Sequence, residues 1–225
     1  MKVKLTSLAV AMIVLLTTLS GCSVSTPSAH VDEADDVTPV EMRHRMQWVE
    51  IPVGKDTVFA KEVLQLIETS KTLRKGDEDH SLFSQNELPK ITEFYNLDKF
   101  NIEGYELGRA FVNSVNFIFD YFRDTKEMTA MSGRIVVTIT RPDYMDTHLP
   151  DTDLYKYRLE HQDPKSIRLT EDDMLYYEMA GMIEARLGRT TVSVQPQMLG
   201  EMSYEELRDL ALRVIESAEL VTVKG

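Results

Sequence analysis

The stretch Gly133-Arg-Ile-Val-Val-Thr-Ile-Thr140 is the segment on which the fold prediction depends most. Its β-branched residues are typical of a strand, and Ile135, Val137 and Ile139 would share one face. Further on, residues 155–160 alternate apolar and charged side chains, which predicts a half-buried strand. We expect these two strands to pair as an antiparallel hairpin, with a long polar loop between them.

The segments before this strand read mainly as helices. Residues 102–122 are the most apolar stretch after residue 45, and we predict one central helix there. An earlier helix is predicted from Asp56, as its N-cap, to about Leu73. Residues 48–53 alternate and contain Pro52, which favours a strand at a sheet edge or at its end. Short helical pieces are expected between about 83 and 100.

The segments after the predicted strand 133–140 carry clear boundary signals. Thr170 to Asp173 resembles a capping box and Gly188 suits a helix C-terminus, so we predict a helix over 170–188. Residues 190–195 predict a short strand. Ser203-Tyr-Glu-Glu206 is a full capping box and opens a predicted helix to about Ala218, followed by a strand over 220–223.

The predicted element order is therefore β-α-α-β-β-α-β-α-β. Hairpins combined with helical crossings favour an α+β domain, with a mixed or mostly antiparallel sheet and about four packed helices.

The predicted loop 141–153 is the best candidate for a site. Asp143, Asp146, Asp151 and Asp153 offer oxygen ligands for a hard cation, and His148 could serve as a general base. The spacing does not match a calcium-binding EF-hand loop, and no glycine allows its sharp turn. We favour a solvated loop that touches a partner over an ion site or a catalytic site, and we expect no metal.

A polar stripe on the predicted 102–122 helix is a second candidate. Arg109, Asn113, Asn116 and Asp120 recur at i, i+4, i+7 and i+11, which places them on one helical face. The stripe would either line a polar groove or form the solvent-facing edge of a core helix. The second alternative is favoured.

Charge and side-chain composition limit the partners. The 225 residues carry a formal net charge of −12, which argues against nucleic acid because phosphate binding needs clustered Lys and Arg. Five methionines lie in the C-terminal third, and they read either as core or as an adaptable apolar binding surface. The core interpretation is favoured; it includes Met179, at helical spacing with Ile183 and Leu187.

The first residues form a targeting signal. Lys2 and Lys4 precede an apolar stretch, residues 5–19, that is short for a membrane span. Leu19-Ser20-Gly21-Cys22 follows and resembles the lipobox of bacterial lipoproteins. That resemblance implies cleavage between Gly21 and Cys22 and acylation of Cys22 (diacylglycerol, with palmitate as a typical chain). Ser23, rather than Asp, implies transfer to the outer membrane, facing the periplasm.

The domain organisation follows from this signal. Residues 1–21 would be the signal peptide, 22–45 a lipidated and flexible tether rich in Ser, Thr, Pro and Asp, and 46–225 one globular domain. Cys22 is the one cysteine of the chain, so no disulfide can form within it.

Three functions remain open at this point. No H-E-x-x-H, G-x-S-x-G or phosphate-binding glycine loop is present, so we favour a non-enzymatic accessory lipoprotein, without a cofactor, that binds an envelope protein. The alternatives are a ligand- or lipid-binding module with a pocket beside residues 102–122, and a periplasmic hydrolase that uses the 141–153 loop.

Overall fold

The computed structural model describes residues 48–54, 57–72, 87–124, 126, 133–162, 168–169 and 172–224. Contacts divide the chain into two units, 1–38 and 39–225, and every described residue belongs to the second. The lipobox, the cleavage site, Cys22 and the tether lie outside the described residues, so the expectations for them stay predictions. Asp56 also lies outside them, but its predicted role as an N-cap is wrong, because the helix begins at Phe59 with Val58 at its N-cap. None of the described helices is long and apolar enough to cross a membrane.

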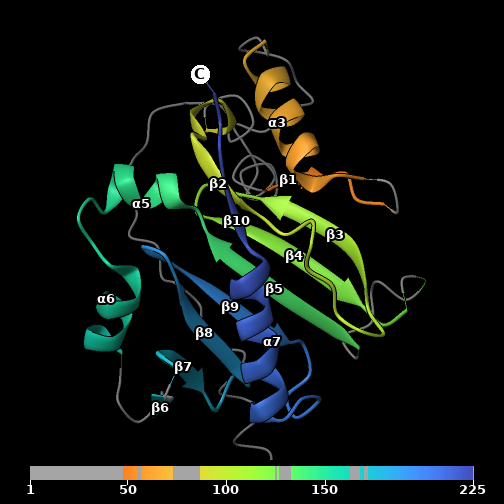
Figure 1. Ribbon diagram of the computed structural model, residues 1–225, viewed down its shortest axis with the longest axis vertical. Coiled ribbons are helices and arrows are strands. Elements are labelled where there is room, and N and C mark those ends of the chain that lie inside the picture. Colours follow the sequence, from red (N-terminus) through yellow and green to blue (C-terminus); the bar gives the residue numbers. More distant parts are fainter. Residues whose placement is uncertain are drawn as a thin grey trace, which may run out of the picture. The chain divides into compact units, whose positions relative to one another are not determined.

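An antiparallel sheet of eight strands forms the centre of this unit (Figure 1). The strand order is β1-β3-β4-β5-β9-β8-β7-β6, and β10 and β2 pair as a separate antiparallel ribbon. The strands run Val49–Ile51 (β1), Glu93–Asn96 (β2), Glu106–Val112 (β3), Asn116–Phe122 (β4), Arg134–Thr140 (β5), Arg168–Leu169 (β6), Met174–Tyr177 (β7), Met182–Leu187 (β8), Thr190–Pro196 (β9) and Glu219–Thr222 (β10).

Four α-helices accompany the sheet in the described part of the chain: Phe59–Ser70 (α3), Pro142–His148 (α5), Leu154–His161 (α6) and Tyr204–Ser217 (α7), with a 3₁₀ turn at Leu88–Lys90 (η1). α7 lies along the sheet beside β8 and β9 (Figure 1). The predicted class, α+β with a mostly antiparallel sheet and about four helices, is confirmed.

The core forms where the sheet meets α3, α7 and β2. Phe59, Val63 and Ile67 line the buried face of α3, and Leu207, Leu210, Ala211 and Val214 line that of α7. Ile135, Val137 and Ile139 of β5 face these helices and are buried, as their alternation predicts. Burying such side chains contributes roughly 1.5–3 kcal/mol each.

Several predicted elements are confirmed with small shifts in their ends. β1 is an edge strand, β5 and β9 lie where they were predicted, and β10 follows α7. The capping box of α7 forms, because the Ser203 hydroxyl accepts from the N–H of Glu206 while the Glu206 carboxylate accepts from the N–H of Ser203.

The predicted helix over 102–122 is wrong. The segment forms β3 and β4, with Phe117, Phe119 and Tyr121 on the core face of β4. The turn between the strands is set by Asn113, whose Oδ1 accepts from the N–H groups of Val115 (2.8 Å) and Asn116 (2.7 Å). Aromatic and β-branched residues buried on both sides of a strand hide the alternation that would have indicated it.

The predicted strand over 155–160 and its hairpin with 133–140 are also wrong. Residues 154–161 form α6, because the Asp153 carboxylate accepts from the N–H of Lys156 (3.0 Å) and caps the first turn. β5 pairs instead with β4 and β9.

The predicted helix over 170–188 is a hairpin of β7 and β8. Gly188, taken as the end of a helix, has φ +60° and begins the short turn from β8 into β9. A left-handed glycine serves a helix end and a hairpin turn equally well, so it could not distinguish them.

Candidate functional site

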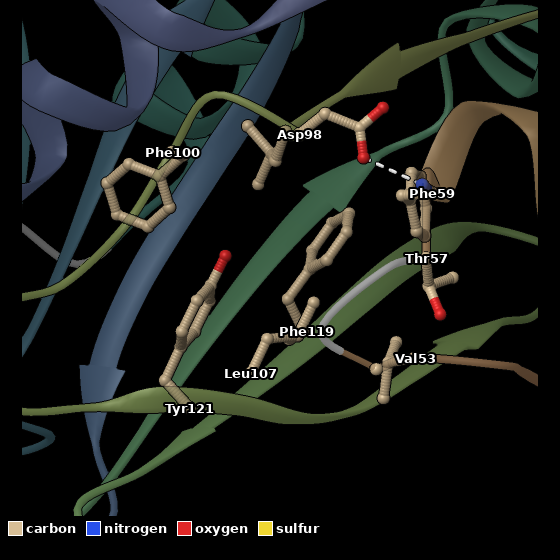
Figure 2. Close-up of a pocket in the computed structure, with 10 residues that line it drawn as sticks. Val53, Thr57, Phe59, Asp98, Phe100, Leu107, Phe119 and Tyr121 are labelled. Carbon is tan, nitrogen blue, oxygen red and sulfur yellow. Dashed lines mark hydrogen bonds between the residues drawn. The ribbon is translucent and has the colours of Figure 1, made fainter.

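A pocket opens beside the first turn of α3, on the core side of β3 and β4 (Figure 2). Its volume is about 220 Å³, which is smaller than the roughly 300–1,000 Å³ of sites for drug-sized ligands and leaves room only for a very small molecule. Three segments far apart in the sequence form it: the chain after β1, the turn after β2, and the hairpin β3–β4. The lining residues are Val53, Gly54, Thr57, Phe59, Leu97, Asp98, Phe100, Leu107, Phe119 and Tyr121.

Four of the ten lining residues are aromatic, and each is almost fully buried. Phe59 packs against Phe119 with ring centroids 4.9 Å apart, and Phe100 meets Tyr121 edge-on at 5.5 Å. Phe119 and Tyr121 share a face because they are two residues apart on one strand. Figure 2 shows the four rings converging from α3, β4 and the turn after β2.

Asp98 connects the pocket to α3. Its Oδ1 accepts from the N–H of Phe59 (2.6 Å), and its Oδ2 lies 3.5 Å from the N of Ala60. Val58, at the N-cap, gives no side-chain hydrogen bond. A carboxylate at this place satisfies free N–H groups and is favoured by the helix dipole. The helix that carries Phe59 is therefore held in place by the rim of the pocket.

The hydroxyl of Tyr121 is the unusual group of this wall. Tyr121 is 3 % exposed, and burial raises the pKa of its hydroxyl, which therefore stays protonated. Among the described residues it has a ring contact with Phe100 and no hydrogen-bond partner. Figure 2 shows its oxygen directed toward the turn that carries Asp98 and Phe100. The hydroxyl oxygen itself is not sealed off from solvent and opens on the pocket, so a water or a bound molecule can pair with it there.

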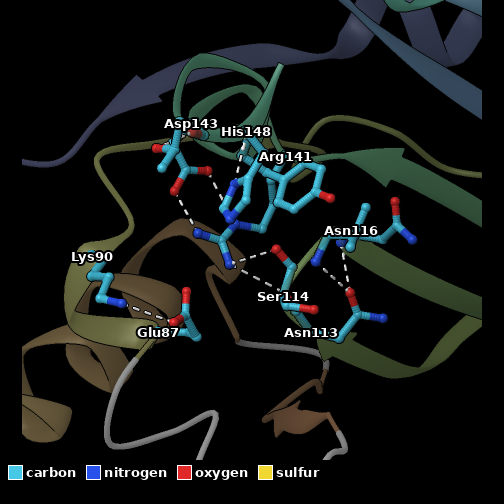
Figure 3. Close-up of polar contacts among 11 residues, drawn as sticks. Glu87, Lys90, Asn113, Ser114, Asn116, Arg141, Asp143 and His148 are labelled. Atoms are coloured by element: carbon cyan, nitrogen blue, oxygen red, sulfur yellow. Dashed lines mark hydrogen bonds and ion pairs between the residues drawn. The ribbon is translucent and has the colours of Figure 1, made fainter. Parts of the chain in front are cut away.

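The predicted 141–153 loop is largely helical, and three of its four aspartates pair with different arginines. Arg141 and Asp143 form a buried ion pair, with Nε of Arg141 donating to Oδ1 at 3.0 Å (Figure 3). The same guanidinium donates to the carbonyls of Asn113 (3.2 Å) and Ser114 (3.3 Å). This pair, which we call the Arg141 clamp, joins the start of α5 to the β3–β4 turn.

The remaining members of that set lie apart. Asp146 pairs with Arg189, and Asp153 both caps α6 and lies 3.1 Å from Nη1 of Arg186. The His148 ring stacks on Tyr144 at 4.3 Å. Asp151 adopts φ +62° between the helices. In the part of the chain that the structure describes, no three His, Cys, Asp or Glu side chains come together as a metal site.

The polar stripe divides into two pairs. Arg109 and Asp120 are partners in the β3–β4 register, 4.0 Å apart, on the sheet face opposite the core. Asp120 also accepts from Nη2 of Arg134 at 2.7 Å. Asn113 shapes the turn (Figure 3), and Asn116 accepts from the Thr140 hydroxyl at 3.1 Å. They do not line one groove.

An apolar surface lies where the β7–β8 turn meets the segment that follows β9. Met179 in the β7–β8 turn is 89 % exposed, and Met198 and Leu199 after β9 are 46 % and 67 % exposed. We call these three residues the Met–Leu tip. The two turns touch, since a Cβ added at Gly181 would lie 2.8 Å from Cδ1 of Leu199 and Gln195 donates to the carbonyl of Ala180. The predicted core position of Met179 is wrong, because the residue sits in a turn.

Comparisons of the chain with models of protein families, with curated proteins and with solved structures find no match. Sequence reasoning missed Asp98 and Tyr121 as site residues. Residues 102–122 were predicted to form a helix, and in a helix Tyr121 would have no neighbours on adjacent strands. Phe117, Phe119 and Tyr121 recur at every second position, but Ile118 and Phe122 on the other face mask this alternation, so the sequence carried only a weak signal for the wall.

Proposed function

We propose that this protein is a lipid-anchored, non-enzymatic accessory protein of the bacterial envelope that acts by binding a protein partner. The lipobox-like Leu19–Cys22 supports the anchor, and the Met–Leu tip supports the binding. The outer membrane, with the domain facing the periplasm, is the location that Ser23 favours.

The exposed apolar tip is the observation that carries the proposal. Large apolar side chains gathered at a surface mark interaction sites, and methionine adapts to varied partners. Glu178 and Glu201 are exposed next to the tip, and the whole chain carries a net charge of −12. The partner surface that fits is apolar and bordered by Lys or Arg, because opposite charge at the rim steers encounter.

Photocrosslinking in cells tests the partner surface. A photoreactive amino acid at Met179 should give one dominant adduct with an envelope protein, and Leu199→Ser in the same chain should reduce that adduct. Tyr157, which is 46 % exposed on α6, supplies the control position. The purified partner should then bind the full-length protein, and Leu199→Ser should weaken that binding. Identical adducts from both positions, or binding unaffected by Leu199→Ser, would overturn the proposal.

The anchor has its own test. Cys22→Ser should leave the signal uncut or release the protein from the membrane. If the variant fractionates with the outer membrane as the wild type does, the lipoprotein assignment fails.

A second candidate function is ligand binding in the pocket beside α3. The hydroxyl of Tyr121, which opens on the pocket and has no hydrogen-bond partner in the described part of the chain, favours it. The hydrolase alternative gains no comparable support, since Asp143, Asp146 and Asp153 each pair with an arginine.

A further inference from the structure

We infer that the pocket beside α3 binds a small organic cation, an alkylammonium group that carries a hydrogen-bonding atom. This inference depends on the second candidate function and names the chemistry of its ligand. It goes beyond the partner-binding proposal, because the pocket and the Met–Leu tip are formed by different elements.

The wall of the pocket is suited to a cation. The faces of Phe59, Phe100, Phe119 and Tyr121 carry the negative part of the aromatic quadrupole, and ammonium ligands are held by such sets of rings. Elsewhere in the molecule arginine already uses this interaction, since Arg109 and Arg134 lie over Phe122 and Arg186 lies over Tyr155. In the described part of the chain, no arginine or lysine lies over the four rings of the pocket.

The rim adds a negative charge. Asp98 accepts hydrogen bonds from the first turn of α3, and no lysine or arginine among the described residues pairs with it. Its neighbour Lys99 reaches away to Glu219. A cation bound against the rings would therefore meet a carboxylate that is held in position by the helix. The net charge of −12 draws cations toward the protein as a whole.

The Tyr121 hydroxyl defines the second feature of the ligand. The Tyr121 side chain is buried, but its oxygen opens on the pocket and is directed toward the turn that carries Phe100 (Figure 2). A ligand oxygen or N–H placed there would satisfy it while the ammonium group contacts the rings. A purely hydrocarbon ligand would fill the pocket and leave this hydroxyl unpaired.

Titration calorimetry with choline tests the inference on the full-length protein in a non-ionic maltoside detergent. The matched probe is 3,3-dimethylbutan-1-ol, which replaces the nitrogen of choline by carbon and keeps the hydroxyl. We expect choline to bind roughly tenfold more tightly than the neutral probe, because the ring and carboxylate interactions need the charge.

Two conservative variants assign the contacts. Asp98→Asn keeps an oxygen for the N–H of Phe59 and removes the charge, so choline should bind about tenfold more weakly. Tyr121→Phe removes one oxygen and should weaken both probes by roughly 3–10-fold without lowering the melting temperature. Asp146→Asn is the control, because it removes one negative charge on α5 and should leave binding unchanged.

The outcomes separate the two claims. If both probes bind equally and Asp98→Asn has no effect, the pocket takes a neutral ligand, so the cation inference is overturned while ligand binding stands. If neither probe binds the folded protein, both the inference and the ligand-binding function are overturned. If Asp146→Asn weakens choline as much as Asp98→Asn does, binding reflects net charge, and the site is wrong.

Discussion

Replacing Asp143 by alanine should strongly destabilise the domain, because it leaves a buried positive charge behind. Arg141 and Asp143 are 3 % and 5 % exposed, and the guanidinium would keep only the two carbonyls of the β3–β4 turn as partners. Removing one partner of a buried ion pair costs roughly 3–5 kcal/mol. For a domain of this size that corresponds to a fall in Tm of roughly 6–20 °C.

Asp146→Ala provides the matched control. It makes the same change one turn further along α5, where Asp146 and Arg189 are 50 % and 55 % exposed. An exposed pair contributes at most about 1 kcal/mol, so the expected fall in Tm is at most about 4 °C.

Urea unfolding followed by circular dichroism measures both variants, with the free energy of unfolding extrapolated to water. A double variant, Arg141→Met with Asp143→Leu, should recover much of the loss, because apolar side chains of similar size need no charge partner. If Asp143→Ala and Asp146→Ala lose the same small free energy, the Arg141 clamp does not hold α5 to the β3–β4 turn. The aspartates of residues 141–153 would then behave as solvated acidic groups, as the sequence predicts.

Two further predictions concern the backbone and pH. Gly188→Ala should lower the free energy of unfolding by more than Gly104→Ala does. Both glycines have positive φ, which costs alanine roughly 1–2 kcal/mol. In addition, a Cβ at Gly188 would lie 2.7 Å from the Tyr95 hydroxyl oxygen, whereas a Cβ at Gly104 meets nothing within 4 Å. Equal losses in thermal melts would show that the contact with Tyr95 relaxes freely. Glu93→Gln should raise Tm at pH 7.5 and have a smaller effect at pH 4, because burial, then Asp146 and Asp143, raise the pKa of Glu93. A carboxyl group whose pKa is raised by folding stabilises the protein at pH values below its unfolded-state pKa, and this stability is lost as the pH rises through its folded-state pKa. An increase in Tm that is the same at both pH values would contradict this expectation.

Elements whose signals are local could be predicted from the sequence. The Ser203–Glu206 capping box spans four residues, and both of its hydrogen bonds form within one turn of α7. The alternation of Ile135, Val137 and Ile139 requires only that one face of a strand be buried. The lipobox-like motif and the tether are equally local, and they remain predictions.

The tertiary structure decided whatever depends on distant neighbours. The first turn of α3 is capped by Asp98, which is 39 residues from Phe59, and Arg141 reaches back 28 residues to Asn113. The run over 106–122 became two strands because neighbouring strands pair with it and the core needs one face of each. Site residues followed the same rule, since Phe59, Asp98 and Tyr121 meet only after the sheet forms. Backbone propensity differs by about 1 kcal/mol per residue, whereas burial of a large side chain contributes more, so packing overrides the local pattern.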